Sequence, residues 1–183
     1  MWTYPNMLTV LRLILVPCFV ISYYIPWGYG HFLATAFFLL AIVTDWLDGF
    51  LARKYKQETR FGAFLDPVAD KLMISVALIV ITQTYPHFWI VIPVSLIIGR
   101  EILISALREW MAHAGVSAKV IVSSLGKWKT GFQMSSVITL ILADGLNRFI
   151  LVYLGVVLLY VAALLTLWSM IQYFMEASED LTR

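Results

Sequence analysis

Long apolar segments separated by short polar turns run through the whole chain. Each covers close to 20 residues or more, which is the length that an α-helix needs to cross the roughly 30 Å hydrocarbon core of a bilayer. The pattern therefore predicts six membrane-spanning helices, at about residues 8–25, 31–55, 67–84, 88–114, 118–143 and 149–175. The expected fold class is all-α, with residues 1–183 forming one transmembrane domain that ends in a short polar tail at 176–183.

Proline and glycine residues mark several boundaries of these predicted helices. Pro26 and Gly28 follow the first apolar segment, and Pro86 lies in the turn after the third. Asp66 followed by Pro67 is typical of a helix start, with the aspartate as N-cap and the proline at the first helical position. We therefore expect the third helix to begin at Asp66.

Composition agrees with a membrane protein and argues against a soluble globular domain. The chain is 61% hydrophobic and 13% charged, with a mean hydropathy of +0.86, whereas soluble chains have about 45–50% apolar and about 25% charged residues. Cys18 is the only cysteine, which excludes an intrachain disulfide. The apolar run after Leu8 lacks a clear small-residue cleavage site, so we expect it to remain as the first span. No nucleic-acid partner is expected.

The distribution of basic residues predicts the orientation in the membrane. Lysine and arginine concentrate in the link after the second predicted helix and around the link after the fourth. The opposite turns carry only Arg148. Because basic loops face the cytoplasm, both termini are expected there as well. The basic residues of the two cytoplasmic links are Arg53, Lys54, Lys56, Arg60, Arg108 and Lys119.

Four aspartates stand out because they lie inside or beside apolar segments. Asp45 and Asp48 are three residues apart, and Asp66 and Asp70 are four apart, so each pair shares one face of a helix. A carboxylate in such surroundings is costly unless it is paired, protonated or bound to a metal. We therefore expect something cationic among these four side chains.

The chemistry of the four carboxylates favours hard divalent cations. Oxygen ligands suit Mg²⁺ or Mn²⁺, whereas zinc prefers nitrogen and sulfur ligands, and His31, His87 and His113 all lie outside the cluster. Four carboxylates exceed the need of one Mg²⁺. Two ions about 3.5–4 Å apart would use all four and suit in-line attack at phosphorus.

Small residues beside the aspartates leave room for a ligand. Gly49 and Ala52 share a helix face next to Asp48, and Gly62 is a third small position nearby. Arg53 offers a fork of donors that suits a diphosphate. The alternative interpretation of Gly49 and Ala52 is a close helix–helix contact, which is common in membranes.

The spacing of these residues resembles the full sequence signature of the CDP-alcohol phosphotransferase family. In this chain it reads Asp45-x2-Asp48-Gly49-x2-Ala52-Arg53-x8-Gly62-x3-Asp66-x3-Asp70. The resemblance implies transfer of a phosphatidyl group from CDP-diacylglycerol to an alcohol, with release of CMP.

The resemblance also implies roles for individual residues. Asp45, Asp48 and Asp66 would hold metal, and Asp70 would bind the second ion and act as base toward the acceptor hydroxyl. The CDP moiety would be contacted by Gly49, Arg53 and Thr59, with Ala52 and Gly62 beside it. The N-terminal pattern that also recurs in the family, and that we expect near the nucleotide phosphates, is Pro5-Asn6-x2-Thr9-x2-Arg12.

Four cations on the fourth and fifth predicted helices suggest the acceptor. They are Arg100, Arg108, Lys127 and Lys129, and the acidic residues near them in the sequence are Glu101 and Glu109. Glu101 and Arg108 are seven residues apart and are expected to pair, whereas the other cations lack an obvious partner in the chain. An anionic acceptor, sn-glycerol 3-phosphate, would supply one.

Lys127 and Lys129 are expected to have different roles. They are two residues apart, which is about 200° around a helix, so we expect one on the ligand and the other toward lipid headgroups. Residues 126–130 together with Arg100 and Arg108 resemble the phosphatidylglycerophosphate synthases of bacteria within this family. That resemblance implies a multi-pass protein of the bacterial inner membrane, working as a homodimer among membrane lipids with its active site toward the cytoplasm.

Two alternatives remain open at this stage. The same family includes enzymes with another acceptor, such as inositol phosphate. A divalent-cation transporter could also use buried carboxylates, but its acidic residues would be spread over several spans at midplane depth. No serine, cysteine or histidine accompanies the acidic cluster, which favours direct transfer over a covalent intermediate.

Overall fold

The computed structural model describes residues 4–55, 60–113 and 124–181, and within these ranges it is a bundle of α-helices. The helices are long enough to cross a bilayer, since 20 helical residues span about 30 Å. Their bounds are α1 (Tyr4–Tyr24), α2 (Gly30–Tyr55), α3 (Arg60–Thr84), α4 (Phe88–His113), α5 (Ser124–Leu146) and α6 (Phe149–Leu181).

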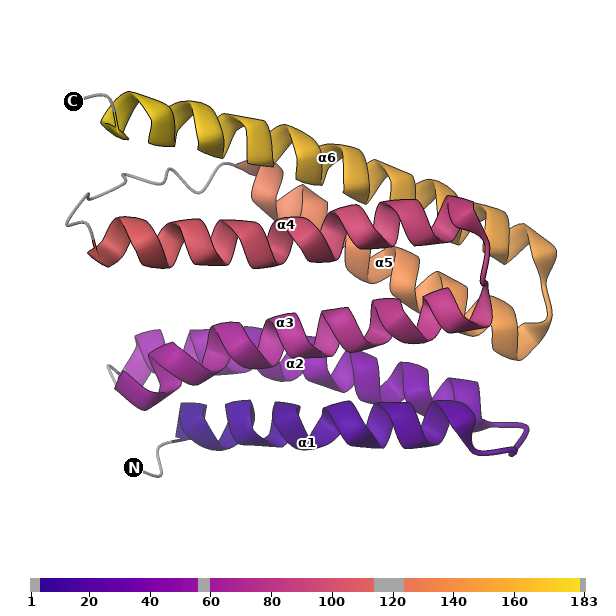
Figure 1. Ribbon diagram of the computed structural model, residues 1–183. Coiled ribbons are helices and arrows are strands. Elements are labelled where there is room, and N and C mark those ends of the chain that lie inside the picture. The colour runs from indigo at the N-terminus through magenta and orange to yellow at the C-terminus, as the bar shows by residue number, and fades with distance from the viewer. Residues whose placement is uncertain (1–3, 56–59, 114–123, 182–183) are drawn as a thin grey trace.

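The helices form two groups of three, α1–α3 and α4–α6 (Figure 1). Within the groups, α1 packs along α2 and contacts α3, while α6 packs along α5 and contacts α4. Contacts of α5 with α2 and α3 join the two groups. The start of α1 and the end of α6 lie at one end of the bundle, and the α1–α2, α3–α4 and α5–α6 turns lie at the other (Figure 1).

Apolar side chains fill the centre of the bundle, and close helix contacts complete it. Phe19, Phe38 and Leu78 are fully buried in one continuous core cluster. The helices α5 and α6 lie close enough for the Ser136 hydroxyl to donate a 2.7 Å hydrogen bond to the Gly155 carbonyl. In a membrane such packing and interhelical hydrogen bonds, rather than exclusion of water, hold helices together.

The outer surface is apolar, as expected for contact with lipid. Four helices, α1, α2, α4 and α6, are long and apolar enough to cross a membrane. The other two, α3 and α5, run in the same bundle and carry Asp66, Asp70 and Lys129. Together with the apolar surface, these helices identify the chain as an integral membrane protein.

Exposed tryptophans lie toward both ends of the bundle. Trp27 follows α1 and Trp89 begins α4, at the end that holds the turns. Tryptophan is enriched where a membrane meets water, so two such belts agree with helices that cross a bilayer. The exposed tryptophans toward the other end are Trp46, Trp110, Trp128 and Trp168.

The all-α bundle predicted from the apolar segments is confirmed, with three differences in helix bounds. The predicted helix start at Asp66 is wrong, because α3 begins at Arg60 and Pro67 lies inside it. The tail predicted from residue 176 is helical as far as Leu181. At its end α5 continues to Leu146, and the chain turns at Asn147, whose φ of 51° is left-handed. The predicted start of the fifth helix, at residue 118, lies outside the described residues.

A polar cluster joins four helices at the end that holds the turns. Asp144, near the end of α5, accepts a hydrogen bond from the Tyr23 hydroxyl (3.0 Å) and pairs with Nε2 of His31 (2.8 Å). The Tyr23 hydroxyl also lies 2.8 Å from the Thr84 hydroxyl on α3. Burial, with a smaller effect of the Asp144 charge, raises the pKa of Tyr85 in the neighbouring turn to about 12. Tyr85 is therefore a neutral donor, and its hydroxyl bonds the Leu140 carbonyl (3.2 Å).

Candidate active site

The four aspartates of the acidic cluster lie on two neighbouring helices. Asp45 and Asp48 occupy the second half of α2, and Asp66 and Asp70 lie in the first half of α3. Because α2 ends and α3 begins at the same end of the bundle, both pairs are placed near the end where α1 starts (Figure 1). The spacing inferred from the sequence therefore brings the carboxylates together.

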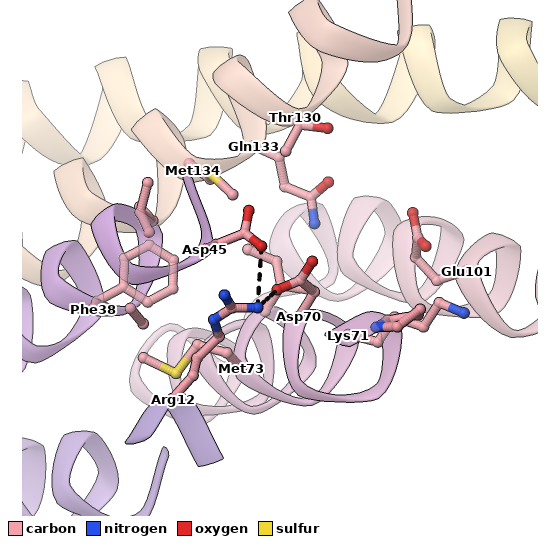
Figure 2. A pocket seen from close by; sticks show the side chains of 14 residues that line it. Arg12, Phe38, Asp45, Asp70, Lys71, Met73, Glu101, Thr130, Gln133 and Met134 are labelled. Atoms are coloured by element: carbon pink, nitrogen blue, oxygen red, sulfur yellow. Dashed lines mark hydrogen bonds and ion pairs between the residues drawn. The ribbon is translucent and has the colours of Figure 1, made fainter. Parts of the chain in front are cut away.

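The cation among these carboxylates is the guanidinium of Arg12, from the middle of α1. Its Nη1 lies 3.0 Å from Oδ1 of Asp45 and also contacts Oδ1 of Asp70 (Figure 2). Its Nη2 contacts Oδ2 of Asp48. The Arg12 side chain is 1% exposed. The spacing of the aspartates predicted a cation at this place, whereas Arg12 was expected only near the nucleotide phosphates. The signal that could have identified it was an arginine inside an apolar span.

The fourth carboxylate is held by a neutral partner. The hydroxyl of Thr9, one turn before Arg12 on α1, donates a 2.5 Å hydrogen bond to Oδ1 of Asp66. Asp66 lies inside α3 and not at its start, and its carboxylate is engaged across the α1–α3 interface. Thr9 and Asn6, which we expected near the nucleotide, are both buried, and Thr9 lies against the acidic cluster.

The four carboxylates differ in exposure. The side chain of Asp48 is 5% exposed, whereas those of Asp45 and Asp70 are 42% and 46% exposed. Asp45 and Asp70 also line a cavity, and Asp48 does not. Of the three carboxylates that contact Arg12, those of Asp45 and Asp70 are therefore accessible to a molecule that enters the cavity.

The cavity has a volume of about 280 Å³ and is lined by residues of α1 to α5. Arg12, Asp45 and Asp70 lie on one side of it, and Lys71 and Glu101 lie on the other (Figure 2). The walls between them are mainly apolar. Ligand sites commonly combine such walls with a few convergent polar groups. The other lining residues are Phe38, Ala41, Ile42, Pro67, Met73, Ile74, Thr130, Gln133 and Met134.

Two of the four predicted acceptor cations pair with one glutamate. Oε1 of Glu101 accepts from Nη1 of Arg100 (2.5 Å) and from Nζ of Lys129 (2.7 Å). Nη2 of Arg100 also donates to the Ser169 hydroxyl on α6 (3.3 Å). The expectation that these two cations lack a partner in the chain is therefore wrong. Lys129 is buried, so it is not the lysine that faces lipid headgroups.

Lys71 is a cation of this site that the sequence analysis missed. It follows Asp70 on α3, lines the cavity, and donates to the hydroxyl of Ser105 on α4. That hydroxyl in turn donates to the Glu101 carbonyl (2.6 Å). Within the described part of the chain Lys71 forms no ion pair. Its position beside the last aspartate of an apolar segment was the available signal.

Several predicted site residues cannot be placed at side-chain level. Thr59 lies outside the described residues, as do the side chains of Ala52, Arg53, Arg108 and Lys127. Gly49 lies beside Asp48 on α2, and Gly62 is buried near the start of α3. The predicted roles of all these residues stay predictions.

The acidic cluster fits a divalent cation in donor type and charge. Its donors are all carboxylate oxygens, three of which converge on one guanidinium, and a single arginine balances only part of the charge of four aspartates. Within the described ranges no three acidic, histidine or cysteine side chains surround one point as a metal requires. The three carboxylates surround the Arg12 guanidinium instead, so a metal would have to take the place of this cation.

Comparisons with known proteins identify the family of the chain. The sequence profile of the CDP-alcohol phosphatidyltransferase family matches residues 2–168. A Haemophilus influenzae protein named CDP-diacylglycerol–glycerol-3-phosphate 3-phosphatidyltransferase is 52% identical over 179 residues, covering 97% of this chain and 94% of its own. Proteins of the same name from Escherichia coli K12 and Shigella flexneri serotype 5b are each 48% identical, covering 97% of this chain and 96% of theirs.

Proposed function

The chain belongs to the CDP-alcohol phosphatidyltransferase family, and we propose that it transfers the phosphatidyl group of CDP-diacylglycerol to sn-glycerol 3-phosphate, releasing CMP. The observation that carries this proposal is the near full-length similarity to relatives named for this reaction, at 48–52% identity. The site supports it, because the aspartates of the family pattern meet beside a cavity that reaches the basic helices.

We propose that Asp45, Asp48, Asp66 and Asp70 hold two divalent cations, Mg²⁺ or Mn²⁺. When bound, such cations would neutralise the charge that develops on the diphosphate of the lipid substrate. Their all-oxygen donor set supports this assignment. The small residues Gly49, Ala52 and Gly62, with Arg53, Thr59 and the Asn6–Thr9 face of α1, would contact the CDP group.

Asp70 is the proposed base. It would take the proton of the 1-hydroxyl of glycerol 3-phosphate as that oxygen attacks the β-phosphorus. The bond from this phosphorus to the bridging oxygen breaks, and CMP leaves with that oxygen. Two observations support Asp70: its carboxylate lines the cavity, and it is exposed where Asp48 is buried. Positioning of this kind is the first requirement of general base catalysis.

The basic residues of α4 and α5, together with Lys71 at the cavity, are proposed to bind the phosphate of the acceptor. In addition to Arg100, Arg108, Lys127 and Lys129 predicted from the sequence, Lys71 supports this role because it lines the cavity without an ion pair among the described residues. Arg100 and Lys129 already bind the Glu101 carboxylate, so they would reach the phosphate only with donors that this carboxylate does not use.

The acceptor can be identified by one experiment. Purified protein is given CDP-diacylglycerol, Mg²⁺ and one alcohol at a time: sn-glycerol 3-phosphate, glycerol, inositol, inositol phosphate or serine. CMP release is expected with glycerol 3-phosphate and at most weakly with glycerol, inositol or serine, because the basic residues favour a phosphate. Glycerol 3-phosphate is expected to exceed inositol phosphate because the relatives are named for it. Turnover with inositol phosphate and none with glycerol 3-phosphate would replace the proposed acceptor. Mg²⁺ flux into vesicles without nucleotide would support the transporter alternative.

We further propose that the protein is a homodimer of the bacterial inner membrane, with both termini and the acidic cluster at the cytoplasmic face. The basic links beside the cluster support this orientation. In a Cys18→Ser background, an impermeant maleimide should label Arg148→Cys in intact cells and label Arg183→Cys only after lysis. The reverse pattern would contradict the orientation. Crosslinking in membranes would test the dimer.

A further inference from the structure

Arg12 occupies the position that the proposed function assigns to a divalent cation. Its guanidinium contacts Asp45, Asp48 and Asp70, which are three of the four proposed metal ligands. These contacts use only its two terminal nitrogens. Its Nε is buried and has no hydrogen-bond partner within the described part of the chain. The arginine is therefore oriented entirely by the carboxylates.

The charge in this cluster is only partly balanced. Among the described side chains, Arg12 contributes one positive charge against four carboxylates, and Asp66 accepts from the neutral hydroxyl of Thr9. An uncompensated carboxylate in an apolar bundle is unfavourable. The site should therefore attract further positive charge, and a divalent cation brings twice the charge of the guanidinium in a smaller volume.

Arg12 and a divalent cation cannot both occupy the centre of the cluster. A carboxylate oxygen that binds Mg²⁺ lies 2.0–2.1 Å from the ion, and oxygens of Asp45, Asp48 and Asp70 are already engaged by the two terminal nitrogens of Arg12. Each aspartate keeps a second oxygen, but a metal at the point where the three carboxylates converge would occupy the place of the guanidinium and has to displace it. The released guanidinium would then face the metal charge, which favours contact with an anion such as a phosphate oxygen.

We propose that Arg12 is a positioning residue that stands in for the divalent cation: it holds Asp45, Asp48 and Asp70 together without metal and is displaced when metal binds. This inference rests on the metal assignment within the proposed function. It has two consequences. Arg12 stabilises the metal-free protein, and it competes with the metal, so that the metal affinity of the wild type is lower than its carboxylates alone would give.

The test measures Mn²⁺ binding to purified protein in detergent by the electron paramagnetic resonance signal of free Mn²⁺, with no substrate present. Arg12→Met should bind Mn²⁺ at least about tenfold more tightly than the wild type, because removing a neighbouring cation strengthens the attraction. Its metal-free melting temperature should fall, and saturating Mn²⁺ should raise it by more than in the wild type. Arg12→Lys, which keeps the charge without the fork, should lie between the two in affinity.

Arg100→Met is the matched control. Arg100 is also an arginine paired with a carboxylate, that of Glu101, and its side chain is 12% exposed. Glu101 is not part of the acidic cluster. This variant should lose stability without any change in Mn²⁺ affinity. It separates the loss of a buried ion pair from the loss of a competing cation.

The outcomes are distinguishable from those that test the reaction. Mn²⁺ binding by the wild type with equal or weaker binding by Arg12→Met would overturn the stand-in role and leave the transferase proposal untouched. If Arg12→Met does not fold, equal or weaker binding by Arg12→Lys has the same meaning. Absence of Mn²⁺ binding in the wild type and both variants would overturn the metal assignment and this inference with it.

Discussion

Arg12 and Glu101 each hold opposite charges inside the bundle. Arg12 contacts three carboxylates, and Glu101 accepts from one arginine and one lysine. Ion pairs of this kind gain little over an apolar replacement, but removing one partner leaves a buried charge and costs about 3–5 kcal/mol. Each charge therefore depends on its partner, less so at Asp45 and Asp70, which are 42% and 46% exposed, and the pairs also fix where the side chains lie.

At the residue scale, Lys127 tests the acceptor site. Lys127→Met should raise the KM for glycerol 3-phosphate by about 10- to 100-fold, because a hydrogen bond to a charged group contributes about 1.5–3 kcal/mol. The KM for CDP-diacylglycerol should change by much less. Steady-state CMP release with each substrate varied in turn measures both constants.

Lys129→Met is the comparison variant for Lys127. Lys129 is buried and forms an ion pair with Glu101, so Lys129→Met should also lower the melting temperature. The melting temperature of Lys127→Met should stay at the wild-type value. If Lys127→Met raised only the KM of the lipid substrate, the acceptor phosphate would bind elsewhere.

At the scale of helices, α3 is the element that local sequence signals describe least well. Asp66 and Pro67 have the residue types of a helix start, yet the helix begins at Arg60. A proline inside a helix removes one backbone hydrogen bond. The contact that accompanies this arrangement, from Thr9 to Asp66, links residues 57 positions apart, so no local pattern could predict it.

The contact between α5 and α6 gives a prediction about stability. A Cβ added at Gly155 would lie 2.6 Å from Cγ of Leu140, which is fully buried. Gly155→Ala should therefore lose about 1–3 kcal/mol of stability through overpacking. Gly99→Ala is the control, since its Cβ would meet nothing within 4 Å, and there alanine should be neutral or stabilising by up to about 1 kcal/mol. Thermal unfolding in detergent compares them, and equal melting temperatures would contradict the packing argument.

Sequence predicted much of the fold and half of the site. Apolar runs and their turns placed α2 and α4 closely, because in a membrane the length of an apolar segment fixes a helix. The spacing of the aspartates predicted that each pair shares one face of its helix, because residues three or four apart lie on the same side of a helix. The partners of the charges were not predictable: that Arg12 meets the aspartates and Glu101 meets Lys129 depends on which faces of distant helices pack together.

At the scale of the whole molecule, the two ends of the bundle hold different polar clusters. One end is closed by the cluster of Tyr23, His31, Thr84 and Asp144, which ties α1, α2, α3 and α5 together. Toward the other end, the same helices except α5 bring Arg12 and the aspartates to the cavity. This arrangement fits an enzyme that takes one substrate from the lipid and another from water at a single membrane face.

The most direct test of the account is CMP release by Asp70→Asn, with CDP-diacylglycerol, glycerol 3-phosphate and Mg²⁺ present. Asp144→Asn, at the closed end of the bundle, is the matched control and should keep its turnover once inserted and folded. Loss of a general base typically costs 10²- to 10⁴-fold in rate. We expect a loss of at least about 10²-fold for Asp70→Asn, with wild-type elution and helical content. Near wild-type CMP release by this variant would contradict the assignment of Asp70 and the site built around it.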